Sequence, residues 1–139
     1  MREDILNYLC EEVEQRCKLP TNHFGMGCYY HIQAVVKNAE ILADSCNADK
    51  EVVLISAWLH DIASITDYGF YEDHHIHGAE MAEDILHKFN YSPDKIKLIQ
   101  QCIRNHRGVY RIQELLWRNY VLQKQMLYLI LIMSQVYYI

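Results

Sequence analysis

Apolar side chains recur at three- and four-residue spacing along most of this sequence, which is the period of amphipathic helices and not the alternation of strands. The pattern predicts a first helix over about residues 3–18. Its apolar face consists of Ile5, Leu6, Leu9 and Val13. Only two prolines and five glycines interrupt the whole chain. We therefore predict an all-α protein, a single helical bundle of about five to seven helices.

A second predicted helix carries His31 and extends to about residue 46. Its expected inward stripe consists of His31, Val35, Asn38 and Leu42. Asn47 is a candidate N-cap for the next helix, which contains the apolar run over residues 52–59. That helix ends near His60 and Asp61, so we expect a histidine and a carboxylate to emerge from a core helix.

The later part of the chain predicts two more helices after a polar and aromatic loop over residues 67–73. The first begins in the histidine-rich segment 74–80 and continues through residue 89. The second begins at Ser92-Pro93-Asp94, with Ser as cap and Pro in the first helical position. Its inward stripe consists of Ile96, Ile99, Ile103 and His106. No internal repeat or second domain is indicated.

His31, His60 and Asp61 are the chemically most informative residues, because such side chains on buried helices are costly unless something binds them. Alone, His31 would fit a core histidine that bonds to a carbonyl, and Asp61 would fit a helix cap or a partner for lysine. Together they suit a divalent ion such as iron, manganese, zinc or magnesium. The absence of nearby thiolates argues against a structural cysteine-rich zinc site.

At these residues the chain resembles the HD superfamily of metal-dependent phosphohydrolases, over about residues 1–111. The resemblance rests on the helical His31, the doublet His60-Asp61, the segment 74–80 and the segment 104–108. It implies that His31, His60 and Asp61 hold one catalytic ion, with Asp61 able to bridge two. It also implies that His74 and His106, rather than His75 or His77, hold a second ion when there is one. Arg107 is then a candidate phosphate contact, or otherwise a solvated arginine at a helix end.

The resemblance implies hydrolysis of a phosphate ester, of a nucleotide or another small metabolite, by metal-activated water. Two alternatives stay open: a catalytically inactive helical protein that binds metal or nucleotide, and an oxygenase built on a di-iron site. Glu80 and Glu83 are candidate acid-base groups, although surface glutamates in a first helical turn are common. Tyr68, Phe70 and Tyr71 either stack on a base or close the mouth of the site, and packing is the favoured interpretation.

The composition of the chain limits its expected binding partners and its expected cellular compartment. The chain has 139 residues, 51% of them hydrophobic, which is enough for a single core. A net charge of -5 argues against nucleic acid as a bulk partner. Five cysteines without paired metal-site spacing or a secretory signal are typical of reduced thiols in a cytoplasmic protein. The apolar run over residues 126–133 is far shorter than the ~20 residues that span a bilayer, so no membrane segment is expected.

The tail over residues 112–139 departs from the family pattern. The family's last metal ligand is an Asp on a later helix, whereas this chain has no Asp after Asp94. The tail is atypically apolar, is predicted to be helical, and is a candidate surface for a homo-oligomer. A shifted reading frame would explain both the missing Asp and the apolar composition of the tail. When the tail is back-translated with permitted codons and read one base earlier, it can encode Ala-Asp-Ala across the Gln125-Met126 junction. We therefore expect impaired activity in the chain as written.

Overall fold

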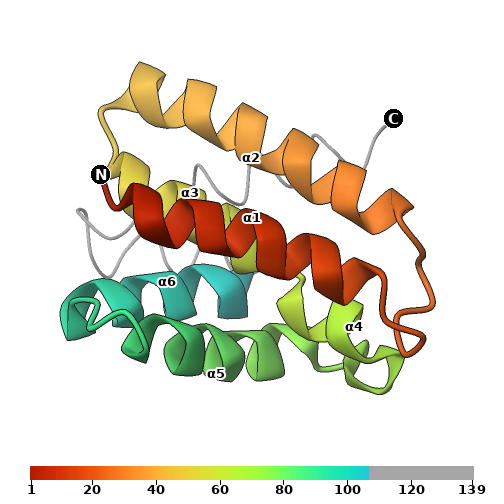
Figure 1. The fold of residues 1–139 in the computed structure, drawn as a ribbon. Coiled ribbons are helices and arrows are strands. Elements are labelled where there is room, and N and C mark those ends of the chain that lie inside the picture. The colour runs from red at the N-terminus through yellow and green to blue at the C-terminus, as the bar shows by residue number, and fades with distance from the viewer. Residues whose placement is uncertain (107–139) are drawn as a thin grey trace.

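The computed structural model describes residues 1–106, which form six α-helices and one short 3-10 turn and contain no strand (Figure 1). The helices are α1 (Glu3–Cys17), α2 (Gly27–Cys46), α3 (Lys50–Leu59), α4 (Ile62–Thr66), α5 (His74–His87) and α6 (Pro93–Asn105), and the turn is η1 (Tyr68–Phe70). The predicted all-α bundle is confirmed.

Helix α3 forms the centre of the bundle. Every residue from Val52 to Leu59 is buried, so this helix is apolar on all sides and cannot lie at the surface. Helices α1, α2 and α6 all pack against it, and Figure 1 shows α1 in front of α3. The largest fully buried side chains are Ile5, Leu9, Ile32, Ile55, Leu59, Ile62, Ile65, Leu86, Ile99 and Ile103. The end of α3 is therefore delivered into the core, where His60 and Asp61 follow.

Helices α5 and α6 form a hairpin whose open end lies beside the end of α3. They pack extensively against each other and are joined by a short turn in which Asn90 has a positive φ of 50°. Because the two helices run in opposite directions, the start of α5 at His74 meets the end of α6 at His106. Helix α4 packs on α5 and continues directly from the doublet.

The predicted N-cap of α3 is wrong by two residues. Asn47 is the C-cap of α2, with a left-handed backbone (φ 52°) that asparagine tolerates better than most residues. Asp49 is the N-cap of α3, and its carboxylate accepts a hydrogen bond from the Val52 amide (3.2 Å). Both residue types cap helices well, so the sequence pattern alone could not choose between them.

The predicted inward stripe of α2 also needs correction. Asn38 is exposed, whereas Ile32, Val35, Ala39 and Ala43 are buried. The buried face is thus rotated by about one residue from the prediction, and His31 lies at its edge with 29% of its side chain exposed. A helix presents neighbouring residues at 100° intervals, so a histidine at the edge of the apolar face reaches both core and solvent.

None of the described helices combines the length and the apolar character that a membrane crossing requires. The boundary near residue 111, the apolar tail, its predicted helix and its role in oligomerisation all fall outside the described residues. They stay predictions, as does the role of Arg107.

A partly buried carboxylate joins the N-terminus to α3 and α6. Glu51 accepts hydrogen bonds from the Tyr91 hydroxyl (2.6 Å), the Arg2 amide (2.8 Å) and the Lys95 ammonium (3.4 Å). Burial would raise the pKa of Glu51, but these donors outweigh it and lower the pKa below its ordinary value. The ionised form of Glu51 therefore stabilises the fold.

We expect Tyr91→Phe to lower the free energy of unfolding by about 1–3 kcal/mol, because it removes a hydrogen bond to a charged group. The full decrease in the free energy of unfolding is expected above pH 4.5, which is the ordinary pKa of the carboxyl group. It should shrink as the pH falls through the lowered pKa of Glu51, where the carboxylate is protonated. Urea unfolding at several pH values measures this, with Tyr30→Phe on the exposed Tyr30 as the control. A loss that does not change with pH would contradict the role of Glu51.

Candidate metal centre

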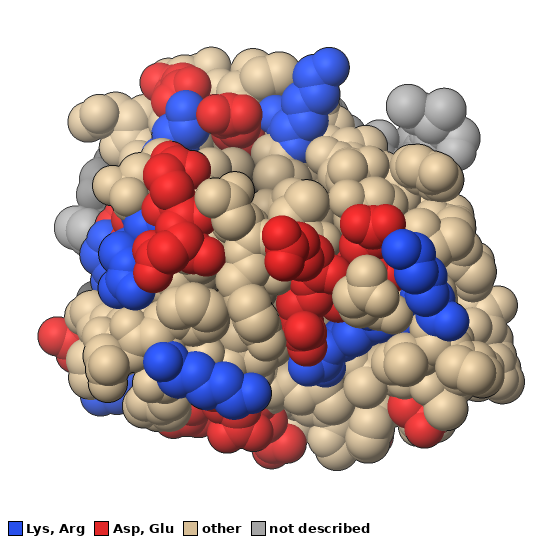
Figure 2. All heavy atoms as spheres, viewed as in Figure 1, with Lys and Arg blue, Asp and Glu red and all other residues tan. Residues whose placement is uncertain are grey.

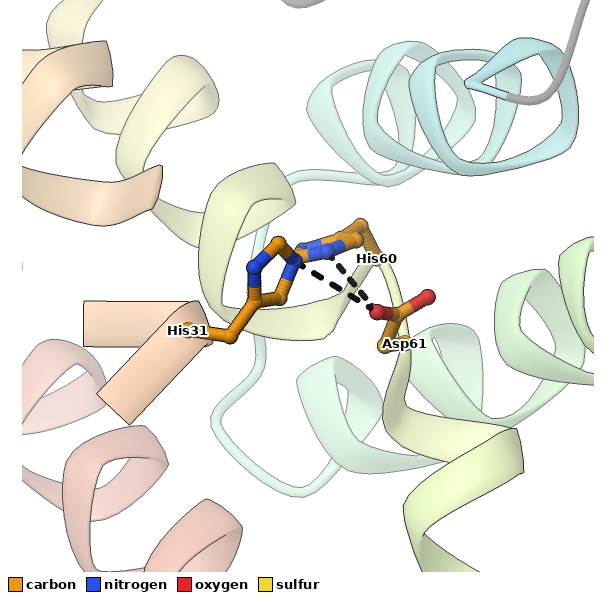
Figure 3. Close-up of side chains that lie close together, drawn as sticks. All are labelled: His31, His60 and Asp61. Atoms are coloured by element: carbon orange, nitrogen blue, oxygen red, sulfur yellow. Dashed lines mark ion pairs between the residues drawn. The ribbon is translucent and has the colours of Figure 1, made fainter. Parts of the chain in front are cut away.

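His31, His60 and Asp61 come together where α2 passes the end of α3 (Figure 3). One carboxylate oxygen of Asp61, Oδ2, lies 3.1 Å from His60 Nε2 and 4.0 Å from His31 Nε2. The ligand atoms of the three residues all lie within 4.8 Å of one another. The rings of His31 and His60 meet edge to face, with centroids 5.7 Å apart. This spacing lets all three side chains contact one ion.

The other carboxylate oxygen of Asp61 faces a second pair of histidines. Asp61 Oδ1 lies 3.3 Å from His74 Nε2 and 3.6 Å from His106 Nε2. The two Nε2 atoms are 2.9 Å apart, and the three residues again form a group with the spacing of metal ligands. Asp61 therefore belongs to both groups and presents one oxygen to each.

The local backbone explains why the Asp61 carboxylate is available for this role. Asp61 is the N-cap of α4, yet its side chain makes no cap hydrogen bond. Its carbonyl oxygen instead accepts the Ile65 amide (3.1 Å) and the Ser64 hydroxyl (2.9 Å), which begins the helix. The carboxylate is left to face the histidines.

Backbone carbonyls orient three of the four rings in the same way. The Nδ1 atoms of His60, His74 and His106 lie 2.7, 2.7 and 2.5 Å from carbonyl oxygens three residues earlier in the chain. A carbonyl can only accept, so each neutral ring carries its proton on Nδ1 and turns the lone pair of Nε2 toward Asp61. This is the second contact that metal-binding histidines usually make.

The resulting donor set fits a divalent cation. Lone pairs of imidazole nitrogens and two carboxylate oxygens converge, and the Nε2 atoms of His74 and His106 are 2.9 Å apart with no ring proton between them in this tautomer. Such a set repels itself unless a positive charge lies among the atoms. Imidazole and carboxylate ligands suit iron, manganese or zinc.

The electrostatics of the site keep Asp61, His31 and His106 in the forms that bind metal. Burial would raise the pKa of Asp61, but the neighbouring imidazoles, above all His60, hold it well below its ordinary value. Burial lowers the pKa of His31 and of His106, so both rings are neutral near pH 7. Burial also acts to lower the pKa of His60, but the charge of Asp61 outweighs it and the net shift is upward.

Gly78 lies where α5 packs closely against α6 and the end of α3. A Cβ atom at this position would lie 3.3 Å from Ile103 Cγ2 on α6 and 3.8 Å from the carbonyl oxygen of His60. The second distance is an ordinary contact and the first is tighter than usual, so a side chain here would press mainly on Ile103 of α6. Gly78, which lies within the segment 74–80 that carries the resemblance, has a packing role one turn after His74.

The site opens on the side of α2. The exposed fraction of the side chain is 29% for His31 and 16% for Asp61, but 6% or less for His60, His74 and His106. A ligand would therefore reach Asp61 past His31, and the other pair lies deeper.

A row of stacked rings leads from the surface to His74. Tyr71 stacks on His74 with centroids 5.9 Å apart, and Tyr68 stacks on Tyr71 at 5.5 Å and on His23 at 4.7 Å. The Tyr71 carbonyl is also the acceptor for His74 Nδ1. The predicted aromatic loop thus packs on itself and holds His74 in place, which agrees with the favoured interpretation of that loop.

The other candidate residues lie apart from these contacts. Glu80 is exposed and lies 3.6 Å from His77 on its own helix. Glu83 accepts a hydrogen bond from Gln100 (2.9 Å), which joins α5 to α6. His77 packs against Phe70 with centroids 4.8 Å apart. In the structure, Glu80 therefore contacts His77 and Glu83 contacts Gln100.

Sequence reasoning did not find the carbonyls that orient the rings, those of Ala57, Tyr71 and Ile103. Every residue has a carbonyl, so residue type carries no signal for this role. The sequence position of each carbonyl could have identified it, because each acceptor lies three residues before a histidine at the start or the end of a helix.

A sequence model of the family described as "HD domain" matches residues 28–133. A protein from Clostridium beijerinckii, described as an uncharacterized protein, is 33% identical over 79 residues, which cover 55% of this chain and 50% of that protein. The chain thus spans about half the length of this relative. No solved structure matches the chain.

We expect His106→Ala to lower the number of bound ions per chain and to leave the helix content nearly unchanged, because only one group of ligands loses a member. Elemental analysis after loading with manganese, iron or zinc measures the ions, and circular dichroism measures the helices. His77→Ala, which changes a half-exposed ring of the same histidine-rich segment, is the control. Equal metal content in His106→Ala and the unchanged chain would leave His106 a buried structural histidine.

Proposed function

Because this chain belongs to the HD domain family, whose superfamily comprises metal-dependent phosphohydrolases, we propose that it hydrolyses a phosphate ester of a nucleotide or another small metabolite. The observation that carries the proposal is the position of Asp61, one oxygen of which faces His31 and His60 while the other faces His74 and His106. One carboxylate between two histidine pairs suits one or two divalent ions.

In this proposal His31, His60 and Asp61 hold the first ion, and His74 and His106 complete a second site with Asp61. An ion bound there would lower the pKa of a water molecule and neutralise charge on the phosphoryl oxygens. The chain itself supplies the orientation: carbonyls fix the rings, and the burial of the deeper pair limits access of bulk water.

The charge of the site and the access to it support a small anionic substrate. The open side at His31 suits a small ligand that places an anionic group beside Asp61 and the bound ion. Figure 2 shows acidic and basic side chains interspersed on the face of α1, so this face offers no continuous positive surface for nucleic acid. Arg107 follows His106 directly in the sequence, and we propose that it contacts the phosphate.

We expect Asp61→Asn to lower turnover by at least about 10- to 100-fold, because losing a ligand is at least as damaging as losing a group that orients one. Metal content should fall with it, since an amide cannot present two anionic oxygens. Nucleotides and a generic phosphodiester provide the substrates, and Asp84→Asn, at an exposed position of α5, is the matched control.

The same measurements separate the alternatives. Metal binding without hydrolysis of any substrate would support the inactive metal-binding protein. An oxidised product that forms only in air would support a di-iron oxygenase. Hydrolysis that does not change in Asp61→Asn would contradict the proposal.

We further propose that residues 1–111 are the HD-like domain and that the tail from residue 112 lacks the family's last Asp ligand. Inserting one base after codon 111 should then raise metal affinity by at least about 10- to 100-fold, because it restores a charged ligand. Turnover should rise with it. Isothermal titration and the same substrate panel compare the two forms, with synonymous recoding of the same codons as the control. Equal affinities and rates would mean that another group replaces the Asp.

A further inference from the structure

Two cysteines meet where α1 ends and α2 begins. Cys17 is the last residue of α1 and Cys28 is the second residue of α2. Their Sγ atoms are 2.8 Å apart. This distance is shorter than two unbonded sulfur atoms normally keep, so the two thiols are in direct contact. The spacing in the sequence gives no sign of this pair, because a loop over residues 18–26 separates the two helices.

The surroundings hold the pair in place and leave one thiol accessible. Cys17 is buried, whereas Cys28 is partly exposed. The Asn22 amide group donates to the Cys17 carbonyl (2.7 Å) and to Cys28 Sγ (3.4 Å), so the loop is tied to both helix ends. The Cys28 thiol also lies 2.8 Å from the Gly25 carbonyl oxygen. The two sulfurs are therefore juxtaposed by the fold.

The geometry requires little movement for a bond to form. A disulfide has an S–S distance of about 2.05 Å, so closing the 2.8 Å gap moves the sulfurs by less than about 1 Å. Two other cysteines are placed differently: Cys10 lies against the Tyr29 hydroxyl (3.5 Å), and Cys102 is buried on α6.

We propose that Cys17 and Cys28 are a redox modification site, at which a low-molecular-weight disulfide such as oxidised glutathione converts the two thiols into one reversible intramolecular disulfide. The bond would close the loop between α1 and α2 and tie the end of α1 to the turn of α2 that precedes His31. In a reducing compartment such bonds are usually transient and respond to redox state.

The reaction is a thiol–disulfide exchange in two steps. The Cys28 thiolate attacks one sulfur of oxidised glutathione, forming a mixed disulfide and releasing one glutathione thiolate. Cys17, as its thiolate, then attacks Cys28 Sγ and releases the second glutathione thiolate. The two thiol protons end on the two released glutathiones, and the two protein sulfurs are oxidised as glutathione is reduced.

The order of the steps follows from exposure. Burial raises the pKa of the Cys17 thiol, so this group ionises poorly and is shielded from the oxidant. Cys28 is more accessible, and the Asn22 amide can donate to its thiolate. Cys17 needs only to reach a sulfur that already lies beside it.

The test uses the full chain treated with oxidised glutathione. Free-thiol titration should fall from five to three, and the mass of the chain should decrease by about 2 Da as two hydrogens leave. Peptide mapping without reduction should find the Cys17–Cys28 linkage. The melting temperature should rise by on the order of 10 °C, because the bond removes freedom from the unfolded chain. Dithiothreitol should reverse every change.

Cysteine variants distinguish a disulfide between Cys17 and Cys28 from oxidation of other thiols. Cys28→Ser changes a partly exposed residue and should abolish both the linkage and the rise in melting temperature, as should Cys17→Ala. Cys10→Ser changes another partly exposed thiol and should leave both intact. A linkage through other cysteines, glutathione retained on Cys28, or dimers joined by disulfides would overturn the proposal. The thiol count, the mass and the mapped linkage do not depend on metal binding, so they stand apart from the proposed phosphohydrolase activity.

Discussion

The enclosure of the Asp61 carboxylate by four histidines is the constraint on which this structure depends. Leaving one member of a buried ionic group without its partners costs about 3–5 kcal/mol, a large fraction of the stability of a small domain. His31, His60, His74 and His106 therefore have to remain assembled around this charge. These four residues come from α2, the end of α3, the start of α5 and the end of α6, so four regions of the chain are joined through one side chain.

The bundle is arranged so that those regions can meet. Helix α3 is apolar on every side and lies in the centre, which brings its last turn into the core. The α5–α6 hairpin brings its two ends to the same place, and Gly78 lies where α5 packs closely on α6. Helix α1 supplies no ligand, but Ile5, Leu9 and Val13 pack within the same core as α3. Packing thus places the backbone, and the carbonyls then orient the rings.

Helical periodicity was sufficient to predict the five longer helices and the end of α3, because a long apolar run followed by His60 and Asp61 has few other interpretations. It did not predict α4, because five residues are too short to show a helical period. It failed where several residues satisfy the same local rule. Asn47 and Asp49 both suit a helix end, and Asn38 lies close enough to the apolar stripe to be counted in it. Ring orientation and the Cys17–Cys28 contact depend on tertiary distances, which no local pattern contains.

Helix α2 connects the metal centre to the thiol pair. His31 lies at the edge of its buried face and forms the open side of the centre, and Cys28 lies one turn earlier. The deeper histidines are held by carbonyls and by the α5–α6 hairpin, neither of which involves α2. The position of His31 therefore depends on how α2 is held against α1 and α3. A covalent bond at Cys28 would restrain that helix at its first turn, at the entrance of the centre and away from its buried ligands.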